Sequence, residues 1–128
     1  MIFPDTDILV DVLRKHPPAM TWLKSLGEAQ ILLSGFVCAE LIQGCLSREE
    51  QKRVSDALSD YVVVWPDAQT CDRALLAFSR YHLSHALGLL DALIAQTAMD
   101  LDISLCTFNK KHYQCLSRLR TVQPYEKT

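Results

Sequence analysis

The sequence predicts an α/β fold, with a central, mainly parallel and twisted sheet of four to five strands between two layers of helices. Short apolar runs, such as residues 31–34 and 62–65, have no polar face, which is typical of strands buried on both sides. Longer segments with apolar residues at helical spacing alternate with these runs. A chain of 128 residues suits a single domain, residues 1–128, with a genuine core.

The expected elements begin at the N-terminus. Residues 2–4 form a short apolar run, and His-Pro-Pro at 16–18 ends the helix that follows it. The other strands are expected at residues 31–34, 62–65, 103–107 and 121–122. Helices are expected at residues 7–15, 18–26, 35–44, 47–58, 68–81 and 89–101, with a short one near Asn109. The polar residues 82–88 are expected to form a loop.

Composition and charge argue against several classes of protein. Hydrophobic residues make up 49% of the chain and charged residues 22%, as in ordinary globular proteins. The net charge of -2 provides no general attraction to nucleic acid, which weighs against a DNA-binding module. No apolar run approaches the roughly 20 residues that span a bilayer, and no signal peptide precedes the first strand. The five cysteines form no CxxC pair, so free thiols and a cytoplasmic location are expected.

Acidic residues follow the first strand directly. Ligands of open parallel sheets bind at the carboxyl ends of the strands, which is where Asp5 is expected to lie. Capping of the next helix is a competing role for an acid at this place. Thr6 or Asp7 is expected to supply that cap, and Asp5 is then left without a structural explanation.

Three further polar residues are expected near the same edge of the sheet. Glu40 follows the second strand, Asp91 lies in the most apolar helix, and Asn109 follows the fourth strand. Each has a structural alternative: a solvated Glu40, and helix capping by Asp91 or Asn109. Carboxylates gathered in one place repel one another, and hard cations with oxygen ligands, Mg²⁺ or Mn²⁺, relieve that repulsion.

Four segments of the chain resemble the successive motifs of PIN-domain proteins, and most of all the VapC-type toxins of prokaryotic toxin–antitoxin pairs. They are residues 5–11, 39–44, 91–95 and 107–113. The resemblance covers essentially the whole chain. It implies a Mg²⁺- or Mn²⁺-dependent endoribonuclease that leaves 3′-hydroxyl and 5′-phosphate ends. It also implies a VapB-type antitoxin as partner and a homodimer.

The resemblance also assigns roles to residues. Asp5, Glu40 and Asp91 fall on the family's acidic, metal-binding positions, and Asn109 falls where members carry Asp or Asn. His112 stands where an Asp is common, and Asp7 replaces a frequent Asn or Ser. Supporting hydrogen bonds to a phosphate or a ligated water are expected from Thr6 and Thr107. A basic rim that contacts RNA phosphates is expected from Lys110, Lys111 and Arg14.

Two other functions compete with the nuclease. A phosphoacceptor receiver domain also has early acids and a parallel sheet, and Asp67 after the third strand resembles its acceptor. A catalytically inactive binding module with the PIN fold is the second alternative, because Asn109 is not an acid.

Overall fold

Five short parallel strands form the centre of the protein. The computed structural model describes residues 1–127. The strands are β1 (Phe3–Pro4), β2 (Leu32–Ser34), β3 (Val62–Val64), β4 (Leu105–Cys106) and β5 (Thr121–Val122). They pair in parallel as β1-β4-β5 and as β2-β3, and a parallel bridge between Ile2 and Ile31 joins the two parts. The predicted parallel α/β fold is confirmed, although the strands are shorter than expected.

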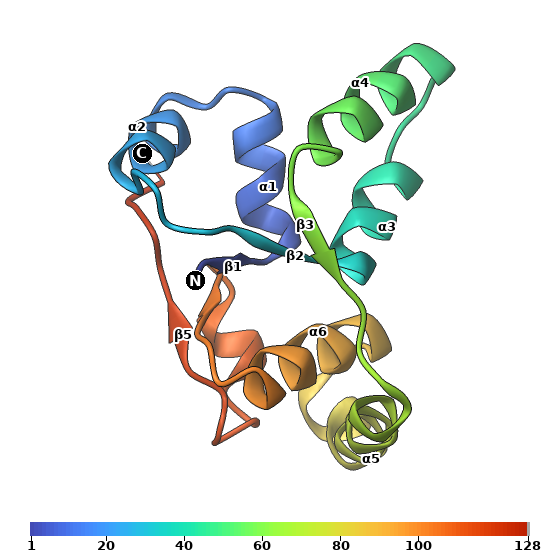
Figure 1. The fold of residues 1–128 in the computed structure, drawn as a ribbon. Helices are drawn as coiled ribbons and strands as arrows, with labels where there is room; N and C mark the ends of the chain where they lie inside the picture. The colour runs from blue at the N-terminus through green and yellow to red at the C-terminus, as the bar shows by residue number, and fades with distance from the viewer. Residues whose placement is uncertain (128) are drawn as a thin grey trace.

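The helices lie on both sides of these strands. In the view of Figure 1, α1 to α4 lie above β1 and β2, whereas α5 and α6 lie below them. Within the described residues the helices are α1 (Thr6–Leu13), α2 (Pro17–Ser25), α3 (Gly35–Gln43), α4 (Arg48–Leu58), α5 (Ala68–His85), α6 (Leu89–Asp100) and the 3₁₀ turn η1 (Lys110–Tyr113). The arrangement brings the starts of α1, α3 and α6 toward the ends of the strands.

The core is one cluster of apolar side chains from the strands and from α6. Phe3 and Leu105 on neighbouring strands are fully buried, as is Ile94 on α6. Three alanines of α6 are also buried, which permits close approach of the neighbouring backbone. The prediction of a central buried helix at 89–101 is therefore confirmed by α6. The backbone of α6 is fixed by this packing, and so are the starting points of its polar side chains.

The predicted loop at residues 82–88 is wrong for residues 82–85, because α5 continues to His85, and is confirmed for residues 86–88. Aromatic rings four residues apart stabilise the added turn: Phe78 stacks on His82 with centroids 4.9 Å apart, and Tyr81 meets His85 edge-on at 5.5 Å. The helix then ends at Ala86 in the left-handed conformation, with φ of 54°. Its polar composition predicted a loop, but these local pairs favour helix.

The expectation that every strand is covered on both faces is wrong for β3. Val62 and Val63 remain 51% and 39% exposed, because β3 is the edge strand next to β2. Trp65, which follows β3, is also exposed and packs edge-on against Phe36 with centroids 5.3 Å apart. This edge of the protein therefore presents apolar side chains to its surroundings.

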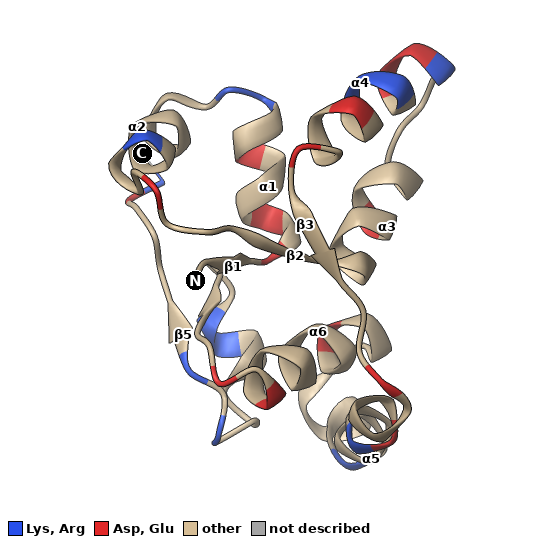
Figure 2. Cartoon of the chain, viewed as in Figure 1, with Lys and Arg blue, Asp and Glu red and all other residues tan. Residues whose placement is uncertain are grey.

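Charged residues of both signs occur on many of the helices and turns. Figure 2 shows lysines and arginines on α2, α4, α5 and η1, with acidic residues between them. All five cysteines are free thiols, as expected. Among the described residues, no helix is both long enough and apolar enough to cross a membrane.

Candidate active site

Asp5 is the N-cap of α1, which corrects the expectation that Thr6 or Asp7 caps this helix. Its backbone is extended, with φ of −76° and ψ of 169°, and the Thr6 N–H donates to Asp5 Oδ1 at 2.9 Å. The extended β1 places Asp5 immediately before the first helical residue, the position at which a carboxylate meets the free N–H groups. Capping therefore occupies one oxygen of Asp5.

The second oxygen of Asp5 is held by two hydroxyls from distant parts of the chain. The Thr107 Oγ1 hydroxyl and the Tyr113 hydroxyl each donate to Asp5 Oδ2 at 3.0 Å. Thr107 and Tyr113 are buried, and Asp5 itself is only 6% exposed. The three donors fix the carboxylate in one orientation, so its role is not limited to capping.

Glu40 turns toward α1 and is only partly exposed, in contrast to the alternative of a freely solvated residue. The Thr6 Oγ1 hydroxyl donates to Glu40 Oε1 at 3.1 Å. Thr6 thus links the two acids, because its N–H contacts Asp5 and its hydroxyl contacts Glu40. Thr6 was expected to contact a phosphate or a ligated water, and here its hydroxyl instead donates to Glu40.

Asp91 is the third residue of α6, and Gly88 is the N-cap, so the alternative that Asp91 is the N-cap is wrong. Its Oδ2 accepts from the Gly88 N–H at 3.1 Å and from His112 Nε2 at 2.8 Å. A Cβ added to Gly88 would lie 2.8 Å from Asp91 Oδ2. Glycine therefore leaves room for the carboxylate, and His112 holds it from the side of η1.

The three acids are close enough to repel one another. Burial raises the pKa of Asp5 above its ordinary value, its three hydrogen bonds lower it, and the charge of Asp91 raises it further. Burial likewise raises the pKa of Glu40, its bond to Thr6 lowers it, and both Asp5 and Asp91 raise it. The charges of these three acids thus affect one another across α1, α3 and α6.

Asp7 lies two residues after Asp5 and contacts the turn that follows β4. The Phe108 N–H donates to Asp7 Oδ2 at 3.0 Å, and Thr107 Oγ1 lies 3.5 Å from the same oxygen. Asp7 Oδ1 is buried and has no hydrogen-bond partner among residues 1–127. Burial and the nearby charge of Asp5 raise the pKa of Asp7, against the effect of the Phe108 N–H.

Asn109 lies beside the acids but points to solvent. Its N–H donates to Thr107 Oγ1 at 3.0 Å, and within the described chain its side chain makes no capping bond to η1. With Lys110, Lys111 and His112 it lines a hollow of about 620 Å³, closed on one side by Phe108 and Gln123. Its side chain is therefore free to contact a bound molecule.

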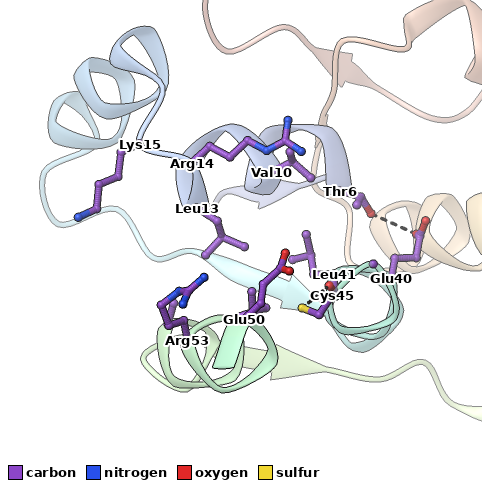
Figure 3. Close-up of a pocket in the computed structure, with 13 residues that line it drawn as sticks. Thr6, Val10, Leu13, Arg14, Lys15, Glu40, Leu41, Cys45, Glu50 and Arg53 are labelled. Carbon is purple, nitrogen blue, oxygen red and sulfur yellow. Dashed lines mark hydrogen bonds between the residues drawn. The ribbon is translucent and has the colours of Figure 1, made fainter. Parts of the chain in front are cut away.

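A larger groove of about 640 Å³ runs between α1, α3 and α4. Thr6 and Glu40 lie at one end, and the basic residues Lys15 and Arg53 lie toward the other (Figure 3). The remaining lining is mainly apolar or basic: Val10, Leu13, Arg14, Leu41, Gly44, Cys45, Val54 and Ala57, with Glu50. Arg14 and the two lysines of η1 thus line different hollows.

The acidic site has the donor chemistry of a Mg²⁺ or Mn²⁺ site. Within residues 1–127, no three Asp, Glu, His or Cys side chains converge closely enough to form a metal-binding group. Mg²⁺ in proteins usually keeps several water ligands and is bound through one or two carboxylates, so it needs no closed cage. The acidic side chains repel one another, and Asp7 Oδ1 has no hydrogen-bond partner in the described residues. A bound cation would therefore stabilise the site. One or two of Asp5, Glu40 and Asp91 could therefore hold such an ion together with water.

Tyr113 has a role that sequence reasoning did not assign. Its hydroxyl contacts Asp5, and burial and the neighbouring acids raise the pKa of this hydroxyl well above its ordinary value, so it remains a donor. The available signal was its place at the end of the segment 107–113, which resembles a motif of the family. Asp67, the acceptor in the receiver alternative, instead caps α5 by accepting from the Thr70 N–H at 2.8 Å.

Comparison with known proteins shows the family of this chain. The model of the PIN domain family matches residues 2–115, and the chain belongs to that family. This result contradicts the receiver alternative.

Among curated relatives, Ribonuclease VapC10 of Mycobacterium tuberculosis is 34% identical over 122 residues, which cover 94% of this chain and 91% of the relative. A toxin–antitoxin complex from Klebsiella pneumoniae is similar with a TM-score of 0.78 and 25% identity, and the match covers 98% of this chain and 99% of that one. VapBC-1 from nontypeable Haemophilus influenzae has a TM-score of 0.77 and 25% identity, with 97% and 98% of the chains covered.

Proposed function

We propose that this protein is a Mg²⁺- or Mn²⁺-dependent endoribonuclease and the toxin of a VapBC-type toxin–antitoxin pair. The observation that carries the proposal is the acidic pocket, by which we mean the site where Thr6 links Asp5 to Glu40 and where the charge of Asp91 raises the pKa of both. The similarity to a VapC ribonuclease over 94% of this chain supports RNA as the substrate. We further propose the cytoplasm as the place of action.

Asp5 and Asp91 would hold the ion directly, and Glu40 would either complete its ligands or orient the attacking water. When bound, such an ion lowers the pKa of a coordinated water and offsets charge on the phosphodiester. Hydroxyl and backbone N–H donors keep these carboxylates in place: Thr6, Thr107 and Tyr113 contact Asp5 or Glu40, and the Gly88 N–H contacts Asp91. These donors orient the acids without cancelling their charge, and His112 Nε2 is a further donor to Asp91.

The residues of η1 would contact the RNA backbone. Lys110 and Lys111 are exposed and line the same hollow as Asn109 and His112, beside the acidic pocket. Lysines there would neutralise phosphates that the acids repel. The Asn109 amide would donate to a phosphate oxygen near the bond that breaks. Attack of water on phosphorus with breakage of the P–O3′ bond would leave 3′-hydroxyl and 5′-phosphate ends, as the resemblance to the family implies.

Removal of divalent ions tests this proposal directly. The purified chain is expected to cleave RNA internally in Mg²⁺ or Mn²⁺, to lose that activity in EDTA, and to regain it when the ion is restored. Mapping of the new 5′ ends checks the products, because ligation without prior phosphorylation requires a 5′-phosphate. RNA cleavage of equal rate in EDTA would contradict a metal-dependent nuclease.

We also propose that a VapB-type antitoxin covers the groove between α1, α3 and α4. The groove has an apolar floor that includes Leu13 and Val54, and it reaches Glu40 at one end. A peptide with apolar side chains fits such a floor, and its binding would block access to the acids. The toxin–antitoxin complexes to which this chain is similar support such a partner.

A charge in the floor of the groove is expected to separate antitoxin binding from catalysis. Val54→Asp would place an unpaired carboxylate against an apolar ligand, and we expect antitoxin affinity to fall about a hundredfold. RNA cleavage is expected to remain, because Val54 does not contact the acids. Leu83→Asp on the 88% exposed end of α5 is the matched control. If Val54→Asp lowered both antitoxin affinity and RNA cleavage, the assignment of this groove to antitoxin binding alone would be contradicted.

A homodimer is the remaining part of the proposal. The exposed apolar side chains of β3 and α5, among them Val62, Trp65 and Leu76, support a self-association surface. Light scattering is expected to report twice the chain mass of 14.5 kDa. The continuous core cluster supports treating residues 1–128 as a single nuclease domain.

A further inference from the structure

The segment after β5 folds back over the first two helices. Residues 123–127, here called the C-terminal strap, end beside α2 (Figure 1). The Tyr125 hydroxyl donates to Asp11 Oδ2 on α1 at 2.8 Å, and His16 Nε2 donates to the Lys127 carbonyl at 2.9 Å. Asp11 is buried, so the hydroxyl meets a carboxylate that is shielded from water. The strap is thus fixed at both of these residues.

The strap also holds Phe108, which lies in the turn that contains the site residues. The Tyr125 ring meets Phe108 edge-on, with centroids 5.1 Å apart, and lies 5.9 Å from Trp22 on α2. The Lys127 ammonium lies 4.8 Å from the centre of the Phe108 ring, within the range of a cation–π contact. Phe108 is therefore clamped between the strap and the body of the protein.

Two carboxylates of α1 complete the clamp. Asp7 and Asp11 are four residues apart and share one face of the helix. Asp7 accepts from the Phe108 N–H, and Asp11 accepts from the Tyr125 hydroxyl. The backbone of Phe108 and the ring beside it are consequently held by successive turns of the same helix.

The turn at 107–109 needs such support because it has little regular structure of its own. It lies between the end of β4 at Cys106 and the start of η1 at Lys110. Thr107 contacts Asp5 and Asn109 faces the hollow, so a shift of Phe108 would move residues on both sides of it. Gln123 of the strap itself lines the hollow.

We propose that the C-terminal strap sets the position of the 107–109 turn at the acidic pocket, with Tyr125 as a positioning residue. The strap acts through Phe108 and does not touch the acids of the pocket. Its effect on the reaction rests on the proposed nuclease function, whereas its effect on the turn does not.

Tyr125→Phe is the sharpest variant, because it removes the bond to Asp11 and keeps the ring between Trp22 and Phe108. Loss of one hydrogen bond to a charged group is expected to speed hydrogen exchange of the Phe108 amide about tenfold. The Asp5 amide, bonded to the Cys106 carbonyl, is expected to keep its exchange rate. Tyr81→Phe on α5 is the matched control.

RNA cleavage gives the second readout. We expect kcat of Tyr125→Phe to fall about tenfold with KM nearly unchanged, because catalysis depends on position more steeply than phosphate binding by flexible lysines does. Lys127→Met, which removes only the cation over Phe108, is expected to act in the same direction by about twofold. It serves as the second variant if Tyr125→Phe folds poorly.

The outcomes separate the strap from the proposed function. If the exchange rate of the Phe108 amide were unchanged in both variants, the proposal that the strap positions the turn would be contradicted. Equal acceleration of exchange at all amides would contradict it too, because it signals general destabilisation. If the wild type cleaved RNA and the variants had the same kcat, the positioning role of Tyr125 in the reaction would be contradicted. If the wild-type protein cleaved no RNA, the proposed nuclease function would be contradicted. Hydrogen exchange at Phe108 would still test whether the strap positions the turn.

Discussion

Asp5→Asn is expected to lower kcat/KM for RNA cleavage by about a thousandfold or more, or roughly 4 kcal/mol of transition-state stabilisation. The substitution removes one negative charge from the centre of the acidic pocket and leaves the size of the side chain unchanged. Binding of the ion and its charge-offsetting effect would both be weakened. Rates measured under single-turnover conditions, with Mg²⁺ in excess, check the prediction.

The fold of this variant is expected to survive because the neighbours of Asp5 can adapt. An asparagine oxygen can still accept from the Thr6 N–H, which caps α1. The amide group would then face Thr107 and Tyr113, whose hydroxyls can accept as well as donate. Loss of activity would therefore report chemistry and not unfolding.

The pH dependence of stability provides a control for that conclusion. In the metal-free protein the pKa of Asp5 is raised, so the folded state retains a proton that the unfolded state releases. The stabilisation from this proton is complete below the unfolded value of 3.8 and is lost as pH rises through the folded pKa. Metal-free Asp5→Asn should thus have a higher Tm than wild type at neutral pH, with a gain that shrinks toward pH 4.

Asp67→Asn is the matched substitution for activity. Asparagine caps helices as well as aspartate does, so α5 should remain intact. RNA cleavage by this variant is expected to equal that of wild type. Equal loss of activity in the variants at positions 5 and 67 would contradict a specific role for Asp5.

Asp91→Asn is expected to abolish growth arrest when the chain is expressed without an antitoxin. The charge of Asp91 raises the pKa of Asp5 and of Glu40, and the ion would lose one of its two proposed direct ligands. Expression of wild type should stop growth within the time needed to cut the target RNA, and the variant should grow as cells without the protein do. Growth curves and mapped RNA ends measure the two effects together.

Asp102→Asn controls for the chemical change and for expression. Asp102 is exposed in a turn with φ of 56°, a conformation that asparagine also adopts, and its partner is the surface residue Arg120. This variant should arrest growth as wild type does. Growth arrest by Asp91→Asn at equal protein level would remove Asp91 from the mechanism.

The sequence predicted that acidic side chains lie near one edge of the sheet, because the ends of strands can be recognised from where apolar runs stop. Apolar runs followed at once by Asp5 or Asn109 place polar groups at one edge of a parallel sheet, and the apolar pattern of α6 starts before Asp91. The helical spacing around Asp91 correctly argued against an N-cap there. These inferences depend only on local periodicity.

Other features depend on contacts between distant residues and were not predictable. Thr107 and Tyr113 lie 102 and 108 positions from Asp5, and Tyr125 lies 114 positions from Asp11. The cap of α1 was assigned wrongly because Asp5, Thr6 and Asp7 can all cap, and only the end of β1 decides among them. The groove between α1, α3 and α4 similarly exists only once these helices are packed.

Titration of Mn²⁺ into the protein tests the central claim that Asp5 and Asp91, with Glu40 beside them, bind a divalent ion. Free Mn²⁺ can be followed by its paramagnetic resonance signal, without RNA and without an activity measurement. The account predicts saturable binding to wild type and to Asp102→Asn, and affinity at least about tenfold weaker in Asp5→Asn and in Asp91→Asn. Equal Mn²⁺ affinity in all four proteins would contradict it.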